Sequence, residues 1–174
     1  SVSAALTSFN NRTNINSSYG CAFYPAVQIA DTDNGQYVWV PSSVAAVGAM
    51  AQSQKAAELW FAPAGFNRGG LGALGGPKGP VVIQARQKLD SSQRDDLYEV
   101  NINPIASFPN EGVVIFGQKT LQQTKSALDR INVRRLMIFL KKDISDIAKL
   151  ALFEQNNSST RAQLKFQITN ILSS

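Results

Sequence analysis

Residues 101–121 read NINPIASFPNEGVVIFGQKTL, and this stretch decides the fold class. Within it, residues 105–108 and 113–116 are short segments rich in apolar, β-branched and aromatic side chains, which are typical of strands. Residues 109–112 lie between them and contain proline, asparagine and glycine, which favour tight turns. The stretch therefore predicts two short strands on either side of a turn.

More strands are expected on the N-terminal side of this stretch. The segment Cys21–Ala30 alternates or runs apolar, which suits one strand. The sequence Asp33-Asn34-Gly35 is a strong turn signal, because asparagine and glycine tolerate positive φ. Tyr37–Val40 then returns as a second strand, and Val81–Ile83 is expected to form another.

Helix signals occur between and after these strands. Pro41 and Ser42 open a helix that places Val44, Val47 and Ala51 on one face.

Two further segments have the form of a capping box, in which a side chain accepts from the backbone and a glutamine reaches back. Asp90 with Gln93 predicts the start of a short helix, and Thr160 with Gln163 predicts the start of a helix that runs to Leu172.

The best-defined element is a helix over residues 132–152. At 100° per residue its apolar side chains fall within an arc of about 100°. These are Val133, Leu136, Met137, Leu140, Ile144, Ile147 and Ala151. Five cations fall within about 120° on another side of the helix. They are Arg134, Arg135, Lys141, Lys142 and Lys149, here called the basic stripe.

Strands that alternate with helices predict an α/β fold, a mixed sheet flanked by helices in a single compact core domain over residues 1–174. Residues 1–18 are expected to be an irregular lead-in, and residues 60–80 a loop rich in glycine and proline. The chain begins at Ser1 without methionine and stops directly after a strongly patterned segment. We therefore expect a piece of a larger protein.

The composition excludes several kinds of site. The chain has 174 residues, 44% apolar content, no histidine and one cysteine, Cys21. Without histidine, Ser-His and Cys-His hydrolytic triads are excluded within this chain, and a zinc site lacks its usual ligands. Cys21 is expected to be a buried, inert thiol. No window approaches the roughly 18 apolar residues of a membrane span, so no membrane contact is expected.

Short sequence motifs in the chain do not indicate a nucleotide-binding, metal-binding or catalytic site either. Residues 70–75 match G-x-G-x-x-G, but no clear strand precedes them, so a loop is expected. Asp31 and Asp33 are expected to belong to a solvated turn rather than to a calcium site. Asp95, Asp96 and Glu99 are expected to be solvated helix residues. We expect no catalytic residue, no metal and no cofactor, and hence no enzyme.

The net charge of +5 is located in one region, because residues 119–149 carry eight basic residues against three acidic ones. Three interpretations of the basic stripe remain open. It can be a solvated helix face, it can neutralise nucleic-acid phosphates, or it can dock on an acidic protein surface. The stripe lacks interleaved aromatic residues and the chain has no known RNA- or DNA-binding motif, which argues against nucleic-acid binding.

Several blocks together resemble one family. They are VWVPSS at 38–43, WFAPAG at 60–65, the stretch 101–121, INVRRL at 131–136 and FEQN at 153–156. In this order they resemble the contractile tail sheath proteins of myoviruses, R-type pyocins and related injection machines.

The resemblance implies a structural subunit that polymerises as helical rings around a tail tube and contracts to drive the tube through the host envelope. It implies contacts with identical sheath subunits, the tail tube protein, and baseplate and tail terminator proteins. It further implies a place in the phage tail of the virion, after assembly in the bacterial host cytoplasm. The terminal arms that link subunits in this family are expected to be absent from this chain.

The resemblance makes the basic stripe the candidate interface with the tube or with another subunit. The alternative function is a basic nucleic-acid-binding module, although no nucleic-acid partner is expected for a sheath subunit.

Overall fold

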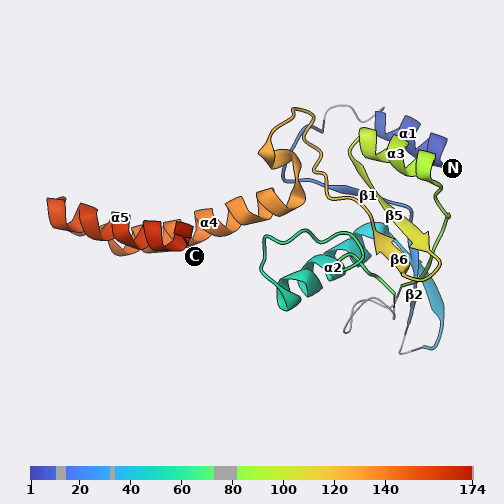
Figure 1. Ribbon diagram of the computed structural model, residues 1–174, viewed down its shortest axis with the longest axis horizontal. Coiled ribbons are helices and arrows are strands. Elements are labelled where there is room, and N and C mark those ends of the chain that lie inside the picture. The colour runs from blue at the N-terminus through green and yellow to red at the C-terminus, as the bar shows by residue number, and fades with distance from the viewer. Residues whose placement is uncertain (11–14, 32–33, 73–81, 174) are drawn as a thin grey trace. The chain divides into compact units, whose positions relative to one another are not determined.

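The computed structural model describes residues 1–10, 15–31, 34–72 and 82–173 (Figure 1). The chain forms two compact units, Ser1–Arg134 and Arg135–Ser174. The strands in the described ranges all lie in the first unit, and the second unit is helical. The expected mixed α/β class is confirmed.

One sheet of the first unit contains the hairpin predicted at residues 109–112. Its strand order is β1–β5–β6, with β1 at Ala22–Tyr24, β5 at Ile102–Phe108 and β6 at Gly112–Ile115. β5 runs parallel to β1 and antiparallel to β6. Gly112 has a φ of 72°, which a side chain with a Cβ would adopt only at a cost.

The second sheet has the strand order β3–β2–β4, and both pairs are antiparallel. The strands are β2 (Val27–Ala30), β3 (Tyr37–Val40) and β4 (Val82–Ala85). The turn between β2 and β3 is confirmed, since the amide of Gly35 donates to the carbonyl of Asp31 at 2.9 Å. Asp33 and Val81 lie outside the described residues.

The single strand expected over Cys21–Ala30 is wrong. Pro25 follows β1 directly, and Val27 begins β2 in the other sheet. Proline has no amide hydrogen and cannot continue a ladder on both sides, so the apolar run splits into two strands. The residues therefore build two small sheets instead of one.

The core lies between these sheets and α2 (Ser42–Ala56), which begins where Pro41 and Ser42 predicted. The helix buries its smallest side chains, with Ala45, Ala46 and Ala49 at most 1% exposed. Because these side chains are small, α2 can approach the sheets closely. The face with Val44 and Val47 is exposed to solvent, at 53% and 65%.

A second apolar cluster joins the N-terminal segment to α3 (Ser91–Glu99). The irregular lead-in expected over residues 1–18 is wrong for its first half, because α1 spans Val2–Asn10. Val2, Leu6 and Phe9 recur at helical spacing and pack with the cluster that contains Leu97. Frequent polar residues between them concealed this period.

The capping box that opens α3 is confirmed. The Asp90 carboxylate accepts from the amide of Gln93 at 2.8 Å, and the Gln93 side chain accepts from the amide of Asp90 at 3.4 Å.

The described part of the loop expected at residues 60–80 covers the open edge of β6. The amide of Gly65 donates to the carbonyl of Ile115, and the amide of Ile115 donates to the carbonyl of Gly69, both at 2.8 Å. The amide of Leu71 donates to the carbonyl of Val113 at 2.8 Å. The strand edge is thereby occupied by irregular backbone. The second half of the Gly70–Gly75 motif, residues 73–75, lies outside the described residues.

Two helices supply the second unit. They are α4 (Ile131–Leu150), whose first turn belongs to the first unit, and α5 (Ser158–Ser173). Both expected helices are confirmed, but the expected capping box of Thr160 with Gln163 is wrong. Asn157 caps α5 instead, since its Oδ1 accepts from the amide of Thr160 at 2.8 Å.

No helix in the described ranges is long and apolar enough to cross a bilayer.

We expect Gly69→Ala to destabilise the first unit. A Cβ at this position would lie 2.7 Å from the carbonyl oxygen of Ile115 and 2.8 Å from the backbone at Ala64 and Gly65. Because these atoms are backbone, the strain should cost about 1–3 kcal/mol in the free energy of unfolding, measured by urea denaturation. Gly72→Ala is the matched control, since its nearest contact would be an ordinary 3.6 Å. Equal stability of the two variants would contradict this packing.

Candidate functional site

The structure divides the basic stripe of α4 into engaged and exposed cations. Lys141, Lys142 and Lys149 are exposed, and Lys149 Nζ pairs with the Asp146 carboxylate at 2.7 Å. The hydrogen bond from Lys149 lowers the pKa of Asp146, so this carboxylate stays ionised at a lower pH than an ordinary aspartate, and the pair is lost as the pH falls through that lowered pKa. These lysines are available to an external partner.

Arg134 is engaged within the first unit. Its Nη2 donates to the Ser18 hydroxyl, and its guanidinium lies 4.2 Å from the centre of the Tyr19 ring. Such cation–π contact fixes an arginine as a structural group. Arg135 is half-buried, and desolvation lowers its pKa. The two arginines of the stripe are thus the more internal ones.

A second surface, which the sequence did not reveal, is a hollow of about 270 Å³ on the first unit. It is lined by Ala62, Ala64, Gly65, Tyr98, Phe116, Gly117, Gln118 and Arg130. We call it the Phe116 hollow. The segments 60–65 and 101–121, which are far apart in the sequence, meet here.

The polar wall of the Phe116 hollow is built around Tyr98. Arg130 Nη1 donates to the Tyr98 hydroxyl at 2.5 Å, and Lys119 Nζ donates to the Tyr98 carbonyl at 2.6 Å. Lys119 also lies 4.1 Å from the centre of the Tyr98 ring. Desolvation, and secondarily the charge of Arg130, lowers the pKa of Lys119. Gln118 Oε1 is buried and accepts no hydrogen bond from the described residues.

Three phenylalanine rings form an aromatic cluster that shares Phe116 with the hollow. The ring centres of Phe66 and Phe108 are 5.0 Å apart, and those of Phe108 and Phe116 are 5.3 Å apart. Arg94 lies 5.5 Å from the Phe108 ring centre. Phe66 is far in the sequence from the β5–β6 hairpin, at which Phe108 and Phe116 lie, so local spacing in the sequence could not have indicated that the three rings meet.

The other residues weighed for chemistry do not form a centre. Cys21 is exposed, so the expected buried thiol is wrong, although desolvation raises the pKa of the thiol and keeps it protonated. Its exposure follows from its place just before β1. Asp95, Asp96 and Glu99 lie exposed on α3. Within the described ranges, no three His, Cys, Asp or Glu residues gather as metal ligands.

Curated relatives cover most of this chain. It is 43% identical over 138 residues to the tail sheath protein of Vibrio phage KVP40, a match to 79% of this chain and 19% of the relative. It is 36% identical over 169 residues to the tail sheath protein of Enterobacteria phage T4, covering 97% of this chain and 24% of the relative. The chain thus spans less than a quarter of the length of these relatives. No family model matches.

Solved structures share the fold. A sheath complex of the extracellular contractile injection system PVC in its contracted state superposes with a TM-score of 0.80 at 23% identity, over 99% of this chain and 44% of that chain. The contracted baseplate of the anti-feeding prophage gives a TM-score of 0.72 at 25% identity, over 94% of this chain and 41% of that chain. By its sequence relatives and by its fold, the chain belongs to the contractile tail sheath protein family.

Proposed function

We propose that this chain is the core part of a structural subunit of a contractile tail sheath, which polymerises as helical rings around a tail tube and contracts to drive the tube through a host envelope. The observation that carries the proposal is 36–43% identity to phage tail sheath proteins over 79–97% of the chain. On this proposal the protein has no enzymatic activity, and its function lies in contacts between subunits.

The proposed partners are identical sheath subunits, the tail tube protein, and baseplate and tail terminator proteins, in a phage tail assembled in the host cytoplasm. Self-association and baseplate contact have the firmer support, because the similar solved structures are a contracted sheath and a baseplate. The tube and terminator contacts rest on the family alone.

The exposed lysines of the basic stripe are the proposed contact with the tube or with a neighbouring subunit. Lys141, Lys142 and Lys149 lie on one side of α4 and face solvent. Exposed ion pairs contribute only about 0–1 kcal/mol each, so a contact made of several can hold a lattice and still break on contraction. The half-buried Arg134 and Arg135 would support the helix rather than meet the partner.

Nucleic-acid binding is the weaker alternative. It would need the stripe as a set of free cations, and the contacts of Arg134 with Ser18 and Tyr19 remove one of them. Salt-sensitive retardation of DNA or RNA by the chain would favour this alternative.

We expect Lys141→Glu combined with Lys142→Glu to abolish sheath assembly while the chain stays folded. The reversal places like charges at a contact that depends on weak ion pairs. Negative-stain microscopy of a sheath protein that carries this sequence, with the tube protein present, measures the fraction of tubes formed. The matched control is Lys55→Glu with Lys88→Glu, which makes the same charge change at two other exposed lysines. Normal tubes from the stripe variant would refute the proposed contact.

We expect Arg134→Ala to destabilise the chain by about 1–2 kcal/mol, because it removes the cation–π contact with Tyr19 and the hydrogen bond to Ser18. Lys142→Ala should change stability by less than about 0.5 kcal/mol, since exposed positions tolerate substitution. Thermal unfolding followed by circular dichroism compares the two. If both variants melt alike, the division of the stripe into structural and available cations is incorrect.

A further inference from the structure

We propose that the turn between α4 and α5 of one copy, with Phe153 and Glu154 at its tip, docks into the Phe116 hollow and its aromatic cluster on a second copy. The inference rests on the proposed function, because it names one of the contacts by which sheath subunits associate.

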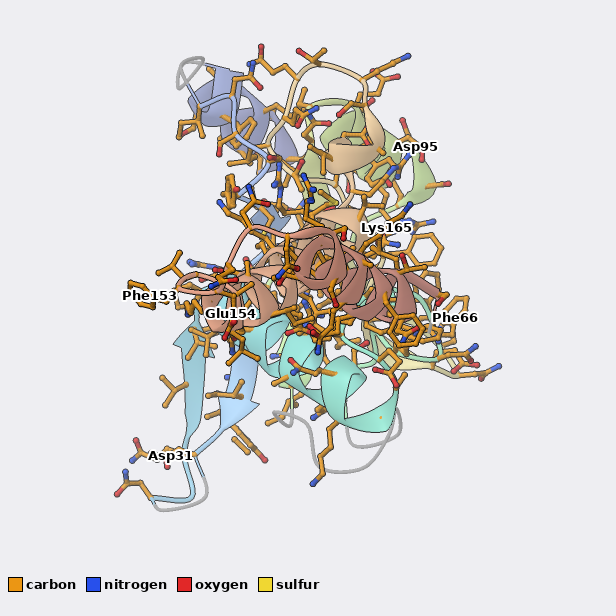
Figure 2. The ribbon with its side chains drawn as sticks, turned by 90° about the vertical axis from the view of Figure 1, so that its left-hand side faces the viewer. Asp31, Phe66, Asp95, Phe153, Glu154 and Lys165 are labelled. Atoms are coloured by element: carbon orange, nitrogen blue, oxygen red, sulfur yellow. The ribbon has the colours of Figure 1, made fainter. Side chains whose placement is uncertain are left out.

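The turn between α4 and α5 carries a phenylalanine side chain that is almost fully exposed to solvent. Phe153 is 96% exposed, and Leu150 and Leu152 beside it are 76% and 69% exposed. Figure 2 shows the Phe153 ring standing clear of the ribbon, with Glu154 next to it. Turns usually carry glycine, proline, asparagine, aspartate or serine, so a phenylalanine here is not explained by turn formation. Contiguous exposed apolar residues mark an interaction site.

The hollow offers a fitting receptor. At about 270 Å³ it is smaller than the roughly 300–1,000 Å³ of ordinary small-molecule pockets, and it suits one or two side chains of a partner. Phe66 and Phe116 beside it are 46% and 42% exposed. Their ring centres are 5.8 Å apart, a spacing at which aromatic rings attract one another, so a further ring can extend the cluster.

Charge and hydrogen bonding favour an acidic segment as the occupant. Three arginines surround the hollow and the cluster. Arg130 lines the hollow, and Arg94 lies 5.9 Å from the Phe116 ring centre. Arg68 Nε donates to the carbonyl of Ala62, a residue that lines the hollow, at 3.1 Å. Arg130 forms an ion pair only with Asp129, at 3.4 Å, among the described residues. Glu154 supplies a carboxylate directly beside the incoming ring.

The buried Oε1 of Gln118 requires a donor. It has no hydrogen-bond partner among the described residues, and a buried acceptor without a partner costs free energy. The exposed area of this oxygen is below 1 Å², so a docking turn can donate to it only when the Gln118 side chain turns outward into the hollow. The side-chain amide of Gln155 is a donor of the kind required.

A second copy is the occupant because the two surfaces differ. Two distinct patches that fit one another make a heterologous contact, which propagates along a helix without closing. A sheath requires contacts of this kind. Each copy would then receive one neighbour and dock on another.

The first test replaces Phe153 with the photoreactive analogue p-benzoylphenylalanine, which keeps an aromatic ring at this position. Chains of ordinary and heavy-isotope composition are mixed, irradiated and digested. We expect cross-linked peptides that join residue 153 of one isotope to the segments with Phe66 or Phe116 of the other. Cross-links within one isotope only would show docking inside a single chain, and cross-links to another surface would show a different occupant. Either result overturns the proposal.

The second test uses complementation. Phe153→Asp removes the tip and Phe66→Asp damages the receptor, so each variant alone should self-associate about tenfold more weakly or worse by sedimentation velocity. An equal mixture should recover a dimer, because each variant retains the half that the other lacks. Leu172→Asp is the control, since Leu172 is 60% exposed on α5 and should change nothing. Circular dichroism checks folding. Unchanged association of the Phe153 variant, or a mixture without dimers, overturns the contact.

The same variants separate this contact from the proposed function. Sheath tubes that form normally from a protein with Phe153→Asp would overturn the docking alone. If the protein with the unaltered sequence forms no tubes with the tube protein, the proposed function itself is refuted.

Discussion

A single buried amide, the side chain of Asn103, holds the first unit together where three segments meet. Asn103 is fully buried in β5, and its Nδ2 donates to the carbonyls of Ala22 at 3.0 Å and Lys119 at 2.8 Å. Its Oδ1 accepts from the amide of Lys119 at 2.6 Å. Without these bonds, backbone groups from β1 and from the segment after β6 would be buried without partners, at about 1–3 kcal/mol each.

The position of the Phe116 hollow follows from this constraint. Because Asn103 holds Lys119, the chain passes so close at Gly117 that a Cβ there would lie 2.9 Å from the Asn103 side chain. The next residues then pair with the start of α4, since the amide of Ile131 donates to the carbonyl of Gln118 at 2.9 Å. The hollow and the first turn of the basic helix are therefore fixed by the same interaction.

The sequence predicted most of the elements of this fold, because their signals are local. The hairpin at residues 109–112, the capping box of Asp90 and the helix after Ile131 all depend on residues within a few positions of one another. The sequence did not predict the features that depend on contacts between residues far apart in the chain. Helix α1 needs α3 beside it, and the Phe116 hollow needs segments some 50 residues apart in the sequence. The helical spacing predicted the five cations of the basic stripe. It could not predict that Arg134 contacts Ser18 and Tyr19, and these contacts distinguish Arg134 from the exposed lysines.

The distribution of contact types suits the proposed function, in which a subunit keeps its fold while its neighbours move. Inside the first unit, buried hydrogen bonds such as those of Asn103 resist separation, because breaking them removes a partner from a buried polar group. At the surface, the exposed lysines of α4 offer ion pairs that water can replace at little cost. The exposed ring of Phe153 offers an apolar contact of roughly 1.5–3 kcal/mol when it is fully buried. A lattice built from such units rearranges at its interfaces first, since packed cores switch between discrete arrangements rather than deform. The proposed contraction by rigid-body motion requires folded subunits that are joined by weaker contacts.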